Sequence, residues 1–585
     1  MDYLKQIEKA TFKGFQSFFD EASSLPVDIV SISDGTPKQI PEEINYSKTS
    51  PTNIGLGFLY QVLARDRGYK TEEESYRDAL AMMKTLIKLE TKEGFLYNWY
   101  YLTGKKEEIP QVVNGRFISS IDNGNLDVCL MVTSEAFLDT ELSQLIEDFL
   151  EKRDYHFFYN KSTHTTKKPK NSINNGFDDE IGVYSPSDYK IFNTEARMVT
   201  LMSIVKNNLP KECWTQQSRL IKHYTTLDKK IITVVAPWSG NLFEALFADE
   251  ILGGAEIAPN AFEINAKRLI QIHQDRGKRL SESGIWGFSN GEVPAEDRYE
   301  MAGIPEIAYN QFPGIFVTPY STFLSLRYAA EDCISNFQAM EKLNPKAFNP
   351  NYGFTDSIHP QTGVVNNNLL ALDKGMEVLS ISNFMNAQEG KKQIPDYFWS
   401  YLKRKDWDKK AKELFHFDQH ESAYQLLNKD RTKIKTNNKN PVSLHTLFQE
   451  MGIFFEPNRA KASHEVIEVN PSTPQINVSY DVSQRYSYCG LYFIFNEFDL
   501  TKYQSINLTI KGDEHHPETI KLEVKHEGDY VLFEHIPVTK NWQQIDISLE
   551  NAGDLKIDEL SFVIENSASG KYKKGNICFQ SIQFS

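Results

Sequence analysis

The sequence has few cysteines and no long apolar run. Its 585 residues include Cys129, Cys213, Cys333, Cys489 and Cys578, which are widely separated and form no C-x-x-C pair. An odd, dispersed set indicates buried free thiols in a reducing compartment and excludes a disulfide framework. A transmembrane helix needs about 18 consecutive apolar residues, and the sequence has no such stretch. The N-terminal residues predict an amphipathic helix instead of a signal peptide. We therefore expect a cytoplasmic protein, or a periplasmic or secreted one if a signal segment has been removed.

The sequence also lacks an excess of basic residues. It has 64 Lys and Arg against 79 Asp and Glu, which gives a net charge of −15. Nucleic acids, anionic membranes and polyanionic glycans all attract Lys and Arg, so we exclude nucleic acid and membrane as partners. A neutral glycan is compatible with this charge. The oligomeric state is not predicted.

Several catalytic and metal-binding motifs are absent. The sequence contains no G-x-S-x-G, no H-E-x-x-H and no P-loop. His416, Asp418 and His420 have suitable spacing for a metal, but they lie in a charged segment without a fourth ligand. We interpret the two histidines as surface residues and predict no metal or other cofactor.

Hydrophobic periodicity divides the chain into three parts. Up to residue 402, helical repeats alternate with loops that carry aromatic residues. Residues 403–465 are charged and mixed, and are interpreted as a connector. From residue 466 the period changes to two, and about eight short strands separated by Gly, Asn and Asp turns predict a β-sandwich.

Three acidic residues stand at the starts of apolar helices. Asn193 is a suitable N-cap, and Glu195 is then placed in the first turn of a helix. Asp122 and Asp373 occupy the same position at the starts of two other apolar runs. One such acid is explained by the helix dipole alone. Three together suggest one chemical centre.

The motifs around these acids resemble those of a known group of domains. SSIDNGNL, FNTEARM, APWSGNLFEALF, ESGIWGFS, VTPYSTFLSL, NYGFTDSI and LDKGMEVLSI occur in the order found in bacterial glucoamylase-like domains. That group includes glycoside hydrolase family 144 and related domains of cyclic β-1,2-glucan synthases. The resemblance implies a mainly α fold, with an (α/α)6-barrel catalytic domain at 1–402. It also implies hydrolysis of β-1,2-glucan or sophoro-oligosaccharides with inversion. The part at 466–585 resembles jelly-roll-like accessory modules of carbohydrate enzymes.

The resemblance assigns roles to the acids. Inverting glycosidases need one carboxylic acid to protonate the leaving oxygen and one carboxylate to activate water. Glu195 matches the acid, Asp373 matches the base, and Asp122 is expected to be catalytic or to orient the sugar. Lys374 is expected to favour the ionised form of Asp373. A helix N-terminus lowers the pKa of an acid, so burial or the charge of Asp122 or Glu244 must counteract it at Glu195.

The same motifs imply a set of substrate-binding residues. Aromatic faces stack on the C–H faces of sugars, and polar side chains bond their hydroxyl groups. The predicted set is Asn123, Arg197, Trp238, Glu244, Trp286, Tyr320, Tyr352, Phe354 and Asp356.

Three other functions stay open at this point. The protein could be an exo-acting glucosidase on another neutral glucan, a polysaccharide lyase of the toroid-plus-sandwich type, or a glycan-binding protein without activity. Lyases favour Tyr, His and basic residues, whereas this sequence offers an acidic trio. The sequence does not distinguish endo from exo cleavage.

Overall fold

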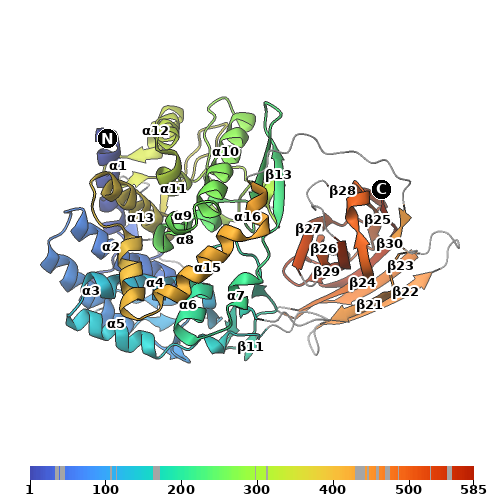
Figure 1. The fold of residues 1–585 in the computed structure, drawn as a ribbon, viewed down its shortest axis with the longest axis horizontal. Helices are drawn as coiled ribbons and strands as arrows, with labels where there is room; N and C mark the ends of the chain where they lie inside the picture. Colours follow the sequence, from blue (N-terminus) through green and yellow to red (C-terminus); the bar gives the residue numbers. More distant parts are fainter. Residues whose placement is uncertain are drawn as a thin grey trace.

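The computed structural model has a helical part and a C-terminal part made of β-strands (Figure 1). It describes residues 1–32, 38–39, 47–105, 108–113, 115–161, 171–296, 298–310, 312, 314–427, 442–444, 447–455, 460–467, 475–484, 487–526, 529–549 and 556–585. We call residues 442–585 the β region. Among the described helices, none combines the length and the apolar character needed to cross a membrane.

Within the described residues, six helices form a closed ring. Each helix contacts the next one, and the last contacts the first. They are α2 (Pro51–Asp66), α4 (Ser120–Ala136), α6 (Arg197–Asn207), α8 (Leu242–Leu252), α11 (Pro319–Leu324) and α13 (Ala371–Gln388). Almost every residue of these helices is buried, as expected for helices surrounded by other helices. At Gly124 of α4, a Cβ atom would lie 2.5 Å from Cβ of Val199 on α6, so glycine permits the close approach of these two helices.

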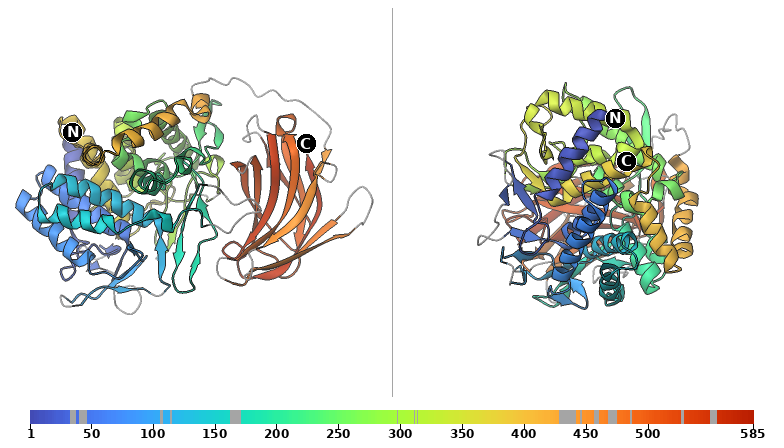
Figure 2. Two further views of the ribbon diagram at one scale, coloured as in Figure 1. Left: turned by 60° about the horizontal axis from the view of Figure 1, so that its bottom comes forward. Right: turned by 90° about the vertical axis from the view of Figure 1, so that its left-hand side faces the viewer.

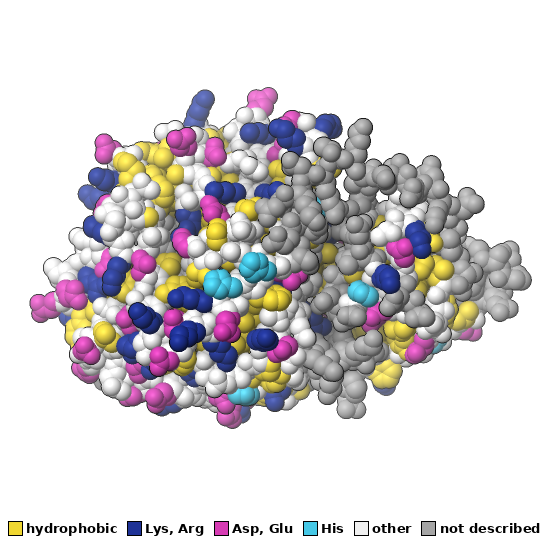
Figure 3. Space-filling model, viewed as in Figure 1, with side chains coloured by type: hydrophobic (Ala, Val, Ile, Leu, Met, Phe, Trp, Pro, Cys, Tyr) yellow, Lys and Arg dark blue, Asp and Glu magenta, His cyan; other side chains and the backbone are white. Residues whose placement is uncertain are grey.

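A second set of helices packs outside the ring. These helices pack on members of the ring: α1 on α13, α3 on α2, α5 on α4, α10 on α8, and α12 on both α11 and α13. Their bounds are Asp2–Gln16, Glu72–Leu86, Glu141–Glu151, Phe262–Leu280 and Leu326–Leu343. The helix α14 (Ile394–Arg404) packs against both α4 and α8. On the face drawn in Figure 3, acidic and basic side chains are interspersed over these outer helices.

Short antiparallel strands connect the helices. The ones that matter for the site are β8 (Phe117–Ser119), β10 (Gly176–Asp178) and β11 (Val183–Tyr184), which form one sheet, and the hairpin of β13 (Ile221–Thr225) and β14 (Ile231–Val235). The other pairs are β9 (Ile173–Asn174) with β12 (Asp188–Tyr189), β15 (Gly291–Glu292) with β16 (Tyr299–Glu300), and β17 (Phe348–Asn349) with β18 (Gly353–Phe354).

The predicted helix starts are correct at two of the three acids. Ser119 caps α4 by accepting a hydrogen bond from the backbone N–H of Asp122, and Asp373 lies in the first turn of α13. The prediction for Asn193 is wrong. The helix α6 begins at Arg197, and the side-chain amide of Asn193 donates to the carbonyl of Val235 at 2.9 Å instead of capping it. Glu195 therefore lies in a turn just before α6.

The described strands of the β region form two antiparallel sheets that face each other (Figure 2). One has the order β22-β23-β30-β25-β28, with β20 beside β30, and the other has the order β21-β24-β29-β26-β27. Inward side chains of both sheets share one hydrophobic cluster, which includes Val478, Leu508, Leu522 and Phe562. The predicted strands agree with β23 (Gln475–Asp481), β24 (Tyr488–Asp499), β25 (Ser505–Gly512), β26 (Thr519–His526), β27 (Asp529–Pro537), β28 (Gln543–Ser548), β29 (Lys556–Glu565) and β30 (Lys574–Phe584).

The segment 403–465, interpreted as a connector, contains regular elements at both ends. The helices α15 (Asp408–His420) and α16 (Ser422–Leu427) contribute Leu414, Phe415 and Tyr424 to the main hydrophobic core. Strands β20 (Val442–Ser443), β21 (Glu450–Phe455) and β22 (Lys461–Ile467) join the sheets of the β region. The many charged residues of α15 made this segment look like a connector in the sequence, although one face of the helix is apolar. His416 and His420 are exposed, as expected, whereas Asp418 is buried and bonds Arg219.

The five cysteines are free and buried, as predicted. A buried ion pair also anchors α4, the helix that carries Asp122. Asp127 Oδ1 lies 2.7 Å from Arg153 Nε, and both side chains are fully buried. The hydroxyl of Tyr155 donates to Asp127 Oδ2 at 2.7 Å, which completes the pairing of the carboxylate.

We expect Asp127→Ala to destabilise the protein by about 3–5 kcal/mol, because it leaves Arg153 as an unpaired buried charge. Urea unfolding followed by circular dichroism measures this. The control is Glu263→Ala, which removes an exposed pair with Lys267 on α10 and should cost about 0.5 kcal/mol or less. Equal costs for the two variants would contradict the role given to the buried pair.

Candidate active site

A cavity of about 300 Å³ lies between the helical part and the β region. This volume is at the lower end of the range for ligand sites in proteins, about 300–1,000 Å³. Its walls combine two carboxylates, Glu195 and Glu244, with the ring of Trp238 and with residues of the β region. Of the residues predicted to act on a substrate, Glu195, Trp238 and Glu244 line it.

Glu195 faces the cavity from the turn before α6. Its oxygen Oε2 has no hydrogen-bond partner among the described residues. Burial, together with the charges of Glu244 and Asp122, raises the pKa of Glu195 to about 8. The backbone N–H groups and Arg197 act in the opposite direction and are outweighed. The effect of the helix N-terminus, expected to oppose an acid role, is therefore outweighed. A pKa of about 8 favours the protonated form of Glu195 at neutral pH.

Glu244 lies in the first turn of α8, whose N-cap is Asn241. Its carboxylate accepts hydrogen bonds from the backbone N–H of Ser239 at 2.8 Å and from the hydroxyl of Ser239 at 2.5 Å. Burial raises the pKa of Glu244 to about 7, although these bonds act against the shift. The bonds fix its carboxylate close to Glu195, so a negative charge on Glu244 stabilises the protonated form of Glu195.

Asp122 is held by neighbouring polar groups. Its Oδ1 accepts a hydrogen bond from the hydroxyl of Thr52 at 2.6 Å, and its Oδ2 accepts one from the amide of Asn98 at 3.0 Å. Burial nevertheless raises its pKa. Asp122 does not line the cavity itself, but its neighbour Ile121 does. It acts on Glu195 through its charge.

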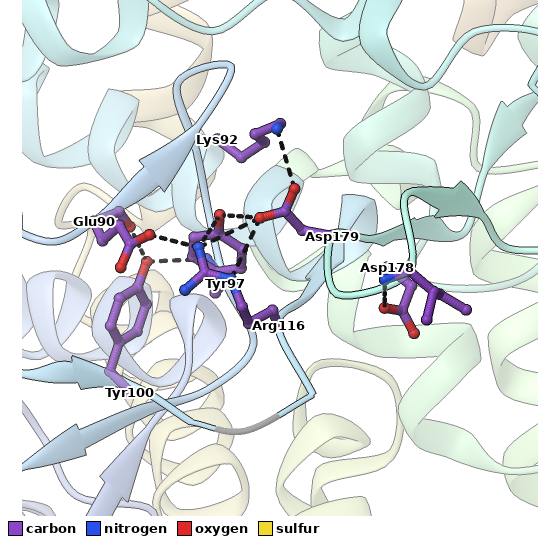
Figure 4. Close-up of polar contacts among 8 residues, drawn as sticks. Glu90, Lys92, Tyr97, Tyr100, Arg116, Asp178 and Asp179 are labelled. Carbon is purple, nitrogen blue, oxygen red and sulfur yellow. Dashed lines mark hydrogen bonds and ion pairs between the residues drawn. The ribbon is translucent and has the colours of Figure 1, made fainter.

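An ion-pair network fixes the strand that leads into α4 (Figure 4). Arg116 precedes β8, and Asp179 follows β10, which pairs with β8. Arg116 contacts Asp179 at 3.3 Å and Glu90 at 2.5 Å, and the hydroxyl of Tyr97 donates to Asp179 at 2.8 Å. These contacts join the two strands just before Asp122, so the start of α4 is held in place.

Asp373 and Asp356 form a second acidic group. Both side chains are buried, and Asp356 Oδ2 accepts a hydrogen bond from the backbone N–H of Glu292 at 2.7 Å. Burial raises the pKa of Asp373 well above its usual range, and the adjacent carboxyl of Asp356 raises it further. Two neighbouring carboxyl groups of this kind titrate as a pair, because the charge of one disfavours ionisation of the other.

The charge of Lys374 favours the ionised form of Asp373, as expected, but other groups outweigh this effect. The ammonium of Lys374 donates to Glu377 Oε2 at 2.5 Å and to the carbonyl of Phe354 at 2.6 Å. The positive charge of Lys374 lowers the pKa of Asp373. Burial and the charges of Asp356 and Glu377 raise this pKa by more, so the net shift is upward. The cation is neutralised by the glutamate one helical turn away, so it does not keep Asp373 ionised.

Tyr299 on β16 links the two acidic groups. The side chain of Tyr299 is 49% exposed, but the surroundings of its hydroxyl and the charges of Asp373, Asp356, Asp28 and Glu195 raise its pKa well above the usual value. All four carboxyl groups are therefore close enough to Tyr299 to act on its hydroxyl. The sequence analysis missed Tyr299, because its segment carries no helical or strand pattern.

Most of the predicted aromatic platforms are in the protein core. Trp286 is 5% exposed, Tyr320 is 1% exposed and Phe354 is fully buried. Tyr352 is next to α1, where the ammonium of Lys13 lies 5.7 Å from its ring centroid. Only Trp238 among these rings borders the cavity. Aromatic residues in turns can point inward as well as outward, and the local motif does not distinguish the two.

The side chains of Asn123 and Arg197 are bonded to other groups of the protein. The amide of Asn123 bonds both backbone groups of Leu96 and accepts a bond from Arg153. Arg197 is 1% exposed and pairs with Asp249 at 3.0 Å. Both side chains have used their hydrogen-bonding capacity, so neither is placed to bind a ligand directly.

Comparison with known proteins finds similarity between the helical part and glucoamylase-like domains. The family model described as "Putative glucoamylase" matches residues 188–388. A segment of 135 residues is 29% identical to the cyclic β-(1,2)-glucan synthase NdvB of Rhizobium meliloti (strain 1021). That match covers 23% of this chain and 4% of the synthase, so this chain spans a small part of that protein's length.

Solved structures have the same fold. A protein from Bacteroides fragilis, also described as a "putative glucoamylase", aligns with a TM-score of 0.57 and 16% identity, over 70% of this chain and 96% of its own. The endo-β-1,2-glucanase of Chitinophaga pinensis, solved with sophorotriose and glucose, aligns with a TM-score of 0.55 and 14% identity, over 69% of this chain and 97% of its own. At such identities the likeness establishes the fold alone. The resemblance to glucoamylase-like domains is confirmed.

The Asp356–Asp373 pair predicts a pH dependence of stability. Because the pKa of Asp373 is raised in the folded state, the folded protein binds more protons than the unfolded chain above the usual aspartate range. Stability therefore falls as the pH rises through this window. Asp356→Asn removes one charge and lowers the pKa of Asp373, so the loss of stability between about pH 5 and about pH 8 should become smaller.

Thermal unfolding of the wild type and of Asp356→Asn at several pH values checks this. The control is Asp332→Asn, which changes an exposed aspartate of α12. If the melting temperature of Asp356→Asn changes with pH as steeply as that of the wild type, the prediction that Asp356 raises the pKa of Asp373 is wrong.

Proposed function

We propose that this protein is a glycoside hydrolase that cleaves β-1,2-linked glucan with inversion of the anomeric configuration. The observation that carries the proposal is the placement of Glu195, a carboxylic acid protonated at neutral pH, in a cavity beside an aromatic ring. The fold that surrounds this cavity is shared with proteins named as endo-β-1,2-glucanases.

Glu195 is proposed to be the general acid. A leaving glycosidic oxygen needs a proton when its bond to the anomeric carbon breaks, and a carboxyl group with a pKa of about 8 still carries one at neutral pH. Glu244 keeps Glu195 protonated before the reaction. Asp122 is proposed to orient the sugar, because its carboxylate is fixed by Thr52 and Asn98.

Asp373 is proposed to be the base, together with Asp356. Two carboxyl groups that share one proton still have one negative charge, which can accept a proton from the attacking water. The raised pKa of Asp373 is compatible with this role, since it describes the pair and not an isolated acid. Tyr299, which is close to Asp373 and Glu195, is suited to hold the water or the sugar between them.

The domain organisation is part of the proposal. We propose that the ring of six helices with its outer helices is an (α/α)6 barrel, and we assign the catalytic domain to it, from residue 1 through α14 and on to α16; the closed ring of contacts supports this. The two facing sheets are assigned to a jelly-roll-like β-sandwich that begins near residue 442 instead of 466. The segment between them is the connector.

We expect Glu195→Gln and Asp373→Asn each to lower kcat by a factor on the order of 10² or more, with substrate affinity broadly kept. Asp122→Asn should change KM and kcat together. Glu250→Gln is the control, since Glu250 is a buried glutamate of α8 that accepts a bond from Asn383 and is absent from the cavity lining. Proton NMR early in the reaction should detect the α anomer of the new reducing end. Retention of configuration, or turnover of Glu195→Gln near that of the wild type, would mean that the roles are misassigned.

The pH profile tests the acid separately. Activity requires protonated Glu195, so kcat/KM should fall as the pH rises above about 8. Glu244→Gln removes a charge that raises the pKa of Glu195, so this alkaline limb should move to lower pH. Glu263→Gln, an exposed change on α10, should leave the limb in place. An unmoved limb in Glu244→Gln would contradict the assignment of Glu195 as the titrating acid.

A further inference from the structure

We propose that the β region forms one wall of the substrate site, and that this site accepts the end of a β-1,2-linked gluco-oligosaccharide instead of the interior of a long or cyclic chain. This inference rests on the proposed function. It assigns specificity to residues of β26, β27 and β29, which the sequence analysis placed in an accessory domain.

The lining of the cavity is shared between the two parts of the chain. On the helical side it includes Glu195, Glu244 and Trp238, and on the other side it includes Lys521, Glu523, Tyr530, Phe533 and Glu565. The second set comes from three neighbouring strands of one sheet, β27, β26 and β29. The proposed acid thus faces a wall that the helical part alone does not provide.

Rings from both parts meet at the cavity. The centroids of Trp238 and Phe533 are 5.4 Å apart with an interplanar angle of 60°. Tyr530 contacts Phe533 edge to face, with centroids 5.6 Å apart. Because sugars present C–H faces to aromatic rings, this group offers a stacking surface next to Glu195.

The charges on the β wall are paired with one another. Lys521 lies 2.5 Å from Glu565, and Lys525 lies 2.8 Å from Glu523. Such a wall has donors and acceptors but little net charge, which suits the hydroxyl groups of a neutral sugar. An anionic glycan would find no cationic excess there.

Contacts around the cavity hold the wall against the helical part. Phe533 is 2% exposed and packs with Ile191, Leu220, Ala236 and Tyr309 in one hydrophobic cluster. The ammonium of Lys222 on β13, also 2% exposed, lies 3.8 Å from Glu534. Separating the two parts would expose this cluster and leave Lys222 as an unpaired charge in an apolar surrounding.

A fixed wall restricts the shape of the substrate. A polymer that is cut in its interior must extend past the acid in both directions, and a cyclic glucan has no end to insert. A cavity of about 300 Å³ bounded by both parts has room for a short terminal segment. The substrate class that fits is a linear oligosaccharide or a chain end.

The experiment uses the full chain and three β-1,2-glucans: short linear oligosaccharides, long linear glucan and cyclic glucan. We expect the wild type to cleave the short substrates and to release products of one size from the long one. Cyclic glucan should react at least about a hundredfold more slowly, measured as kcat/KM.

Tyr530→Ala should raise KM for the short substrates about tenfold, with kcat changed less than about threefold, because a stacking contact is lost while the acid stays in place. Lys521→Met should raise KM in the same direction, and it provides a second test if Tyr530→Ala folds poorly. The matched control is Tyr492→Ala. Tyr492 belongs to β24 of the same sheet and bonds Glu450, but it is absent from the cavity lining.

The outcomes separate the two proposals. No hydrolysis of any of the three glucans would overturn the proposed function. Rapid cleavage of cyclic glucan, or mixed product sizes from the start of the reaction, would overturn the inference and leave the hydrolase intact. Wild-type KM values in both Tyr530→Ala and Lys521→Met would show that the β wall does not contact the substrate.

Discussion

The proposed mechanism depends on the repulsion between two buried carboxyl groups, Glu195 and Glu244. Burial alone raises the pKa of each, and the negative charge of Glu244 raises that of Glu195 further, to about 8. The hydrogen bonds from Ser239 fix Glu244 in the position where its charge is effective. One carboxyl group thus keeps a proton at neutral pH that an isolated glutamate in water would lose. A general acid requires this property, and the surrounding structure serves to maintain it.

The fold maintains this arrangement by bringing distant segments to one end of a helical ring. Glu244 and Asp122 stand in the first turns of α8 and α4, and Asp373 stands in that of α13. These helix starts lie near one another, because the charges of Glu244 and Asp122 act on Glu195, and the charges of Asp373 and Glu195 both act on Tyr299. The β region then covers the cavity that contains Glu195, which reduces its contact with water. The fold therefore raises the pKa of Glu195 in two ways: it brings Glu244 and Asp122 near it, and it buries its carboxyl group.

Local patterns predicted the elements and two of the acidic helix starts, because both depend on neighbours in sequence. The period-two segment INVSYDV became β23, and Ser119 capped α4 next to Asp122. The prediction that Asn193 caps a helix failed because a distant partner decided the outcome: its side-chain amide donates to the carbonyl of Val235. The packing of Trp286 into the core likewise depends on residues distant in sequence. The pairing of Lys374 with Glu377, three residues away on one helix, was accessible to sequence reasoning but was missed. The wall formed by Tyr530 could not be predicted, since no local signal connects it with Glu195.

The proposed mechanism requires that Glu195 carries a proton at neutral pH, and infrared difference spectroscopy detects this proton directly. The C=O stretch of a protonated carboxylic acid is separate from the bands of carboxylates. We expect the wild type to show a protonated carboxyl signal at neutral pH that disappears near pH 8. This signal should be missing from Glu195→Gln. In Glu244→Gln this signal should disappear at lower pH, because the charge that opposes ionisation is gone. A wild-type spectrum at neutral pH with no protonated carboxyl signal that depends on Glu195 would contradict the account.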